Sequence, residues 1–125
     1  MAYNIESSYN AFSDTGLFNV YFGTENENFE KALQVVYQEF RLLREKKLGS
    51  LQMSRAQKQL IGQLAIAGEN HEDLMLSLGK TYLFYNQVDP FREVFRKIEA
   101  ITPEQILEVA NEILNPDQMS MLVYR

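Results

Sequence analysis

The single histidine of the chain, His71, begins a segment that approaches a zinc-binding helix motif. The run His71-Glu72-Asp73-Leu74-Met75 starts like H-E-x-x-H, in which two imidazoles one helical turn apart bind zinc and the glutamate serves as a base. Met75 stands in place of the second histidine, whereas zinc in proteins is held by histidine, cysteine and carboxylate ligands. We therefore expect an exposed helix turn here, with no metal ligand and no catalytic residue.

Carboxylates gather close to this histidine, at Glu69, Glu72 and Asp73. Such a cluster could bind a cation weakly, but a solvated acidic helix face is much commoner. The chain contains no cysteine, which excludes thiolate metal sites and a cysteine nucleophile. No cofactor is therefore expected within this chain.

A basic cluster consists of Arg41, Arg44, Lys46 and Lys47. It is interpreted either as cations that complement the negative end of a helix or as an anion site, and the first interpretation is favoured. Further along, Glu93 and Lys97 are four residues apart and are expected to form an ordinary ion pair on a helix surface.

Length and charge narrow the classes of partner. The 125 residues suffice for one domain with one core. Twelve Lys and Arg against seventeen Asp and Glu give a net charge of −5, which argues against nucleic acid and anionic membranes. No apolar run approaches the roughly 18 residues of a spanning helix, and no signal peptide is visible. A soluble protein is expected, and neither charge nor cysteine content chooses between cytoplasm and periplasm.

A β-hairpin is predicted at the start of the chain. Residues 2–12 and 17–23 alternate in polarity, as strands with two different faces do, and Ser13-Asp14-Thr15-Gly16 between them is typical of a turn. Another alternating run, 119–124, predicts a closing strand. The hydroxyls and aromatic rings of the hairpin suit the binding of an extended peptide by main-chain pairing. The alternative, which is favoured, is a hairpin face that pairs with the rest of its own sheet.

Helices are predicted between the hairpin and that last run, because apolar residues recur at steps of three and four. The first, over about 26–48, is expected to begin at a capping box of Thr24 and Glu27 and to end at Gly49. A second helix is expected to begin at Ser50 or Ser54, and helical structure is expected to continue over 70–87. A further helix is expected over 90–100 with Asp89 as its N-cap, and the last one from its cap Thr102 to Asn115-Pro116.

Together these elements predict an α+β fold, with helices packed on one face of a small, mainly antiparallel sheet in the order strand, strand, helices, strand. Residues 1–125 are expected to form a single domain. Because strands are predicted at both ends of the chain, a fragment of a longer protein is expected. Strands without neighbours leave open edges, so self-association through these edges is also predicted.

Seven short segments of the chain form an ordered pattern. They are Ala2-Tyr3-Asn4-Ile5-Glu6-Ser7, Phe12-Ser13-Asp14-Thr15-Gly16-Leu17-Phe18, Val20-Tyr21-Phe22-Gly23-Thr24, Gln59-Leu60-Ile61-Gly62-Gln63-Leu64, Leu78-Gly79-Lys80, Ile98-Glu99-Ala100-Ile101-Thr102-Pro103 and Val109-Ala110-Asn111-Glu112-Ile113. In this order and spacing, and together with the predicted closing strand 119–124, they resemble the C-terminal, non-zinc-binding half of a pitrilysin/insulinase-type (inverzincin) metallopeptidase unit.

The resemblance implies a unit of two related α+β halves. The first half would carry an inverted H-x-x-E-H zinc motif and a downstream glutamate ligand, and the second would lack zinc ligands and wall a chamber for the peptide substrate. The parent protein is then implied to be a zinc metallopeptidase with its zinc in the other half, while this chain alone is inactive. The implied partners are that N-terminal zinc-bearing half, a second copy or homologous subunit, and a peptide substrate, without nucleic acid or membrane.

The resemblance implies one substrate-binding residue, Tyr3, because a tyrosine at the start of this hairpin helps to grip the substrate in the family. The arginine that accompanies it in the family would lie before Met1. Without the resemblance, Tyr3 is interpreted equally well as a strand aromatic packed against a neighbour. Two other roles stay open for the chain: an inactive structural or assembly subunit, and a peptide-binding module with no catalytic role.

Overall fold

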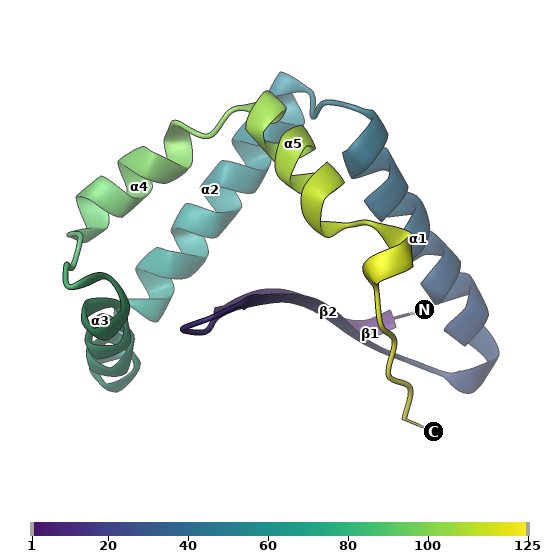
Figure 1. Ribbon diagram of the computed structural model, residues 1–125, viewed down its shortest axis with the longest axis horizontal. Coiled ribbons are helices and arrows are strands. Elements are labelled where there is room, and N and C mark those ends of the chain that lie inside the picture. Colours follow the sequence, from purple (N-terminus) through teal and green to yellow (C-terminus); the bar gives the residue numbers. More distant parts are fainter. Residues whose placement is uncertain (1, 125) are drawn as a thin grey trace. The chain divides into compact units, whose positions relative to one another are not determined.

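The protein is described by a computed structural model that covers residues 2–124 (Figure 1). Its elements are β1 (Ala2–Ala11), β2 (Gly16–Thr24), the 3-10 turn η1 (Asn26–Asn28), α1 (Phe29–Glu45), α2 (Ser50–Ala67), α3 (His71–Tyr85), α4 (Phe91–Glu99), α5 (Pro103–Ile113) and the 3-10 turn η2 (Pro116–Gln118). This content confirms the predicted α+β class. Among the described residues, no helix combines the length and the apolar character needed to cross a bilayer.

The predicted hairpin is confirmed. Strands β1 and β2 pair antiparallel, with Ile5 opposite Phe22 and Tyr9 opposite Phe18. Within the turn, the Phe12 amide donates to the Thr15 carbonyl at 2.8 Å. The Tyr9 ring lies over Gly16, and a Cβ there would come within 2.7 Å of the Tyr9 hydroxyl, so a side chain at this position would displace the exposed ring.

The predicted closing strand is wrong. Residues 119–124 adopt no regular secondary structure, and the sheet of residues 2–124 has two strands. The preceding turn η2 is held by the Asn115 side chain, whose Oδ1 accepts from the Asp117 amide at 3.2 Å. Alternating polarity makes a segment suitable for a strand, but a strand exists only where its backbone groups find a partner, and this segment pairs with neither hairpin edge.

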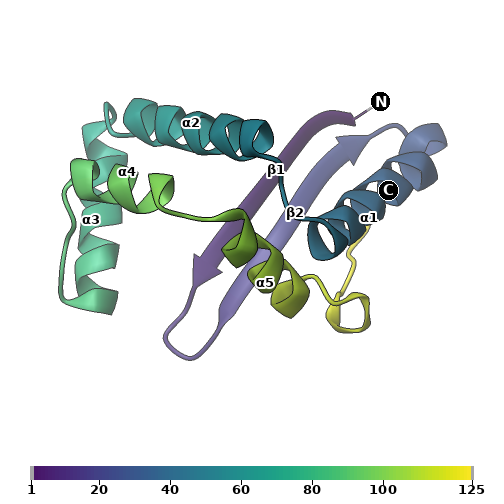
Figure 2. The same cartoon turned by 90° about the horizontal axis from the view of Figure 1, so that it is seen from above.

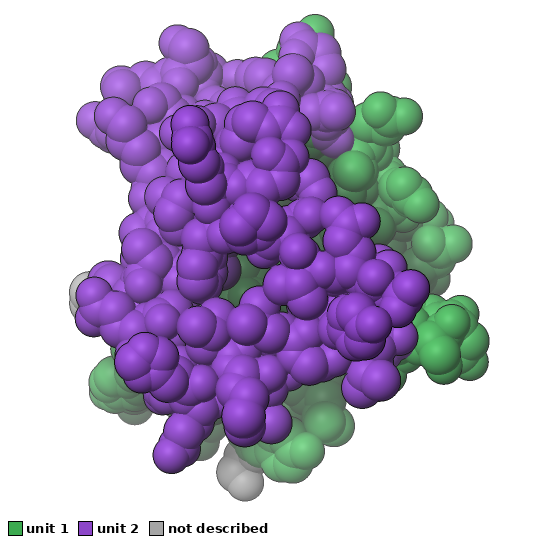
Figure 3. All heavy atoms as spheres, turned by 90° about the vertical axis from the view of Figure 1, so that its left-hand side faces the viewer, with its two compact units in different colours: residues 1–47, 106–125 green, residues 48–105 purple. Residues whose placement is uncertain are grey.

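The chain divides into two compact units, which are described separately (Figure 3). Unit 1 comprises residues 1–47 and 106–125, and unit 2 comprises residues 48–105. The expectation of a single domain stays a prediction, as does the expectation that the chain is part of a longer one.

Unit 1 joins the hairpin, α1 and the end of α5. The rings of Phe22 and Phe29 stack with centroids 6.5 Å apart, which brings the start of α1 to the hairpin. At the other end of α1, Arg44 donates to the Leu114 carbonyl at 3.0 Å and its own carbonyl accepts from Asn111 at 2.9 Å. Leu114 is only 5% exposed, so this junction holds part of the small core.

Unit 2 is built on α2 and α4, which lie side by side (Figure 2). Met53 of α2 and Ile98 of α4 are each 8% exposed. The Gln57 side chain closes the C-terminal end of α4, since its Nε2 lies 3.0 and 3.1 Å from the carbonyl oxygens of Ile98 and Glu99. Helix ends leave such carbonyls without a partner inside the helix, so Gln57 fastens α4 to α2.

The predicted helix boundaries are correct to within a few residues, but several predicted caps are wrong. The turn η1 precedes α1, so the box of Thr24 and Glu27 does not begin that helix. Gly49 is the N-cap of α2 instead of the end of α1. By contrast, the predicted cap at the start of α5 is confirmed, since the Gln105 amide donates to Thr102 Oγ1 at 3.3 Å.

Candidate functional site

Tyr3, the predicted substrate-binding residue, lies near the start of β1 and is 72% exposed. Its hydroxyl donates to the carboxylate of Glu25, just beyond the end of β2. The same carboxylate accepts from Asn28 Nδ2 at 3.1 Å. Because the ionised carboxylate stabilises the protonated phenol, the pKa of Tyr3 is raised. Tyr3 is therefore held by a hydrogen bond while its side chain stays exposed.

The hairpin face that bears Ile5 and Phe22 meets the start of α1. A cavity of about 370 Å³ lies there, lined by Ile5 and Phe22 of the hairpin and by η1 and α1 residues that include Ala32, Val35 and Val36. Farther along the face, Tyr9 stays 68% exposed and Phe18 38%. The hairpin thus presents an aromatic and apolar surface next to Tyr3, with backbone edges open on both sides in the described residues.

His71 occupies the first position of α3 and is exposed. The neighbouring carboxylate of Asp73 is bound by the cap, since Asn70 Nδ2 donates to it at 2.7 Å, while Asn70 Oδ1 accepts from the Glu72 amide at 3.1 Å. Within residues 2–124, no three histidine or acidic residues lie close enough to hold a metal ion.

The basic cluster takes part in helix contacts. Arg41 pairs with Glu45 at 3.8 Å on the surface of α1, and Arg44 binds the Leu114 carbonyl. Arg44 thus binds a carbonyl just beyond the end of α5, and the dipole interpretation of the basic cluster stays a prediction.

Unit 2 contains a larger groove of about 1090 Å³ between the end of α2, α3, the 86–90 connection and α4. Figure 3 shows unit 2 hollowed in the middle of its visible face. The residues that line the groove are mostly apolar, among them Leu64, Leu74, Leu78, Phe91 and Val94.

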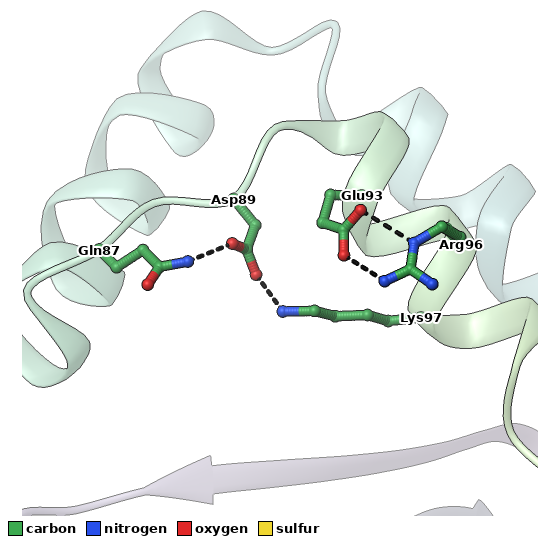
Figure 4. Close-up of polar contacts among 5 residues, drawn as sticks. All are labelled: Gln87, Asp89, Glu93, Arg96 and Lys97. Carbon is green, nitrogen blue, oxygen red and sulfur yellow. Dashed lines mark hydrogen bonds and ion pairs between the residues drawn. The ribbon is translucent and has the colours of Figure 1, made fainter.

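Two ion pairs lie in and just before α4 (Figure 4), and the residues of one of them, Asp89 and Lys97, line this groove. Asp89 accepts from Lys97 and, at 2.7 Å, from Gln87. Arg96 binds both oxygens of Glu93, at 2.6 and 3.0 Å. The predicted Glu93–Lys97 pair is therefore wrong, because each residue has taken a nearer partner. Asp89 is not the N-cap of α4, a position that Pro90 holds.

The pKa of the Asp89 carboxyl is lowered by its hydrogen bonds to Lys97 and then Gln87. Because the pKa of Asp89 is lower in the folded chain than in the unfolded chain, where it is about 3.9, the ionised carboxylate stabilises the fold at pH values above about 3.9. This stabilisation is lost as the pH falls through the pKa of the folded state.

We expect Lys97→Met to raise the pKa of Asp89 towards its ordinary value, as measured by carboxyl-carbon NMR during an acid titration. Arg96→Met is the matched control: it should move the titration of Glu93, whose pKa Arg96 lowers, and leave Asp89 nearly unchanged. An unmoved Asp89 in Lys97→Met would contradict the pairing.

The chain is similar to known protein sequences over most of its length. The sequence profile described as Peptidase M16 inactive domain matches residues 1–60. A protein of Streptomyces coelicolor named uncharacterized zinc protease is 28% identical over 114 residues, which cover 91% of this chain and 25% of that protein. A protein of Rickettsia felis that is also named uncharacterized zinc protease is 27% identical over 123 residues, which cover 98% of this chain and 30% of that protein. The chain thus spans between a quarter and a third of the length of these relatives.

A solved structure shares the fold. One chain of the structure titled "Complex III2 from Candida albicans, Inz-5 bound" superposes with a TM-score of 0.77 and 21% identity, over 86% of this chain and 26% of that chain. At this identity the likeness concerns the fold alone. The profile match and the zinc-protease relatives confirm the resemblance of this chain to the inactive, non-zinc-binding half of a pitrilysin/insulinase-type (M16) metallopeptidase unit.

Proposed function

We propose that this chain acts as the non-catalytic C-terminal domain of a zinc-dependent peptidase, packing against a zinc-bearing half and helping to hold an extended peptide. The observation that carries the proposal is the match of residues 1–60 to a domain described as inactive, in a chain whose relatives are named zinc proteases. These relatives are more than three times as long as the matched segment, which leaves room for a zinc-bearing half.

The chain's own part in such an enzyme would be to bind and orient. Extended peptides bind to sheets through open strand edges and pockets for alternate side chains. In residues 2–124 the hairpin has unpaired strand edges, and Ile5 and Tyr9 are exposed on the strand that carries Tyr3. Zinc, when held by the other half, would polarise the scissile carbonyl and lower the pKa of a bound water.

A role as an inactive assembly subunit is the second candidate. It is favoured by the shared fold with a chain from the structure titled "Complex III2 from Candida albicans, Inz-5 bound". A stand-alone peptide-binding module would have the same hairpin but no zinc-bearing partner. None of these roles requires a catalytic group within this chain.

Reading the coding DNA upstream of Met1 separates these roles. An in-frame H-x-x-E-H with a downstream glutamate codon is the result we expect for a peptidase half, with an arginine codon shortly before Tyr3. An upstream in-frame half without that motif would overturn the peptidase role in favour of an assembly subunit. A stop codon directly before Met1 would leave a free-standing module.

Peptide binding tests the role of Tyr3. We expect Tyr3→Ala to weaken the binding of an extended peptide by the whole protein about tenfold, the effect of losing one hydrogen bond and some ring contact. Tyr3→Phe should show a smaller loss, since it removes the hydroxyl that Glu25 orients. Tyr21→Ala is the control, because Tyr21 is 59% exposed in the same hairpin and pairs with Glu6, on the face opposite to Ile5 and Phe22. Fluorescence anisotropy with a labelled peptide measures all three, and equal losses for Tyr3 and Tyr21 would exclude a specific grip.

A further inference from the structure

Helix α3 carries a row of polar residues along the groove of unit 2. This row, here called the polar stripe, consists of Asp73, Ser77, Thr81 and Tyr85, all of which line the groove. They follow one another in steps of four, so they lie on one stripe of the helix. With a rise of about 1.5 Å per residue, the stripe is about 18 Å long and presents a polar side chain about every 6 Å.

The polar stripe has groups to offer a ligand. Within residues 2–124, the hydroxyls of Ser77 and Tyr85 form no hydrogen bond, and Thr81 Oγ1 donates to the Ser77 carbonyl at 2.9 Å, which leaves its oxygen as an acceptor. Asp73 accepts from Asn70 Nδ2 but has no cation within ion-pair distance in this part of the chain. The stripe therefore presents three hydroxyls and, at one end, a negative charge without a counter-ion.

The spacing of the polar stripe matches an extended peptide. A strand rises about 3.3 Å per residue, so the amide groups on one of its edges recur about every 6.6 Å, close to the spacing of the stripe. The side chains of such a peptide alternate between its two faces, so every second one would meet the apolar residues of the groove. A bound helix would fit less well, because its amides are bonded within the helix and would leave the hydroxyls of the stripe without partners.

The walls of the groove are fixed by local contacts. Asn86 ends α3 in the left-handed conformation, with φ 51°, which turns the chain back towards α4. Asp89 then binds both Gln87 and Lys97, which ties the connection to α4 (Figure 4). The groove is therefore formed before any ligand enters, which lowers the entropic cost of binding.

We propose that the groove of unit 2 binds an extended peptide of about six residues, with its backbone along the polar stripe and a basic side chain at Asp73. A basic residue is specified because the other charges that line the groove, Asp89 and Lys97, neutralise each other. The ion pair with Asp73 is exposed, so salt weakens it. The site lies in unit 2 and uses neither Tyr3 nor the hairpin, so the inference does not depend on the proposed peptidase role.

Peptide titration followed by amide NMR tests the site. Two end-blocked peptides of six residues alternate leucine with serine, one beginning and the other ending with lysine, because the groove does not fix the direction of the chain. At least one should bind saturably with shifts concentrated in α3 and α4, and a glutamate in place of its lysine should weaken binding about tenfold. Neither peptide binding saturably, or shifts confined to the hairpin, would overturn the proposal.

Variants at Asp73 test the charge. We expect Asp73→Asn to weaken binding of the lysine peptide about threefold, as for an exposed ion pair, and to leave a peptide with norleucine in place of lysine unaffected. Glu72→Gln removes the same charge from an exposed neighbour that does not line the groove, and it should change little. Equal losses for Asp73→Asn and Glu72→Gln would contradict a basic side chain held at Asp73.

Variants of two leucines in α3 test the apolar contacts. Leu78→Ala, in the groove, should weaken binding about fivefold. Leu76→Ala should change little, since Leu76 is 67% exposed and does not line the groove. Tyr3→Ala should leave this binding unchanged, because Tyr3 lies in unit 1. A loss with Tyr3→Ala but none with Leu78→Ala would assign the peptide to the hairpin and reject the groove, without weakening the proposed role of Tyr3.

Discussion

Replacing Ile98 by alanine is expected to lower the free energy of unfolding by about 2–4 kcal/mol, because large-to-small changes at buried sites lose transfer energy and leave a cavity. Ile98 is 8% exposed, and it is one of four hydrophobic residues among those described that are buried. Its carbonyl also accepts from Gln57, so the same turn of α4 provides apolar burial and a polar link to α2. Because so few of the described side chains are buried, each buried one contributes a larger share of the free energy of unfolding.

Chemical denaturation measures this loss, with Ile66→Ala as the matched control. Ile66 lies in the same unit on α2 and is 71% exposed, so its truncation should change stability by no more than about 0.5 kcal/mol. Native-state hydrogen exchange should place the loss in α2 and α4. Equal effects for the two isoleucines would show that the α2–α4 contact does not hold unit 2 together.

Local signals in the sequence were enough to predict most elements. Alternation on either side of Gly16 gave the hairpin, and helical spacing of apolar residues gave α1 to α5 within a few residues of their observed bounds. These patterns report on contacts within one element or across one turn. The run 119–124 alternates as clearly as β1 does, but whether it becomes a strand depends on a partner backbone, which alternation does not reveal.

The polar contacts of the candidate sites were much less predictable. Tyr3 was singled out by resemblance, but nothing in the sequence indicates its hydrogen bond to Glu25, 22 residues away. Spacing suggested that Glu93 would pair with Lys97, whereas the turn before α4 brings Asp89 to Lys97 and frees Glu93 for Arg96. Spacing on a helix shows which pairs are possible, but the geometry of the connections decides which ones form.

Replacing Leu114 by alanine is expected to destabilise unit 1 by about 2–4 kcal/mol. Leu114 is 5% exposed and lies where α1 meets the end of α5, beside Ala110, which is also 5% exposed. Its carbonyl accepts from Arg44 at 3.0 Å, and this hydrogen bond uses only the backbone of residue 114. The substitution therefore removes apolar burial while leaving the polar link available.

Leu122→Ala is the matched control, since Leu122 is 76% exposed in the segment after η2. Denaturant titration should leave that variant within about 0.5 kcal/mol of the original chain. Arg44→Met separates the two parts of the junction: it should cost about 1 kcal/mol for the lost hydrogen bond, less than Leu114→Ala. If Arg44→Met cost as much as Leu114→Ala or more, polar contacts would fasten α5 to α1. The expected order, with the larger cost for Leu114→Ala, would assign this junction to the burial of Leu114.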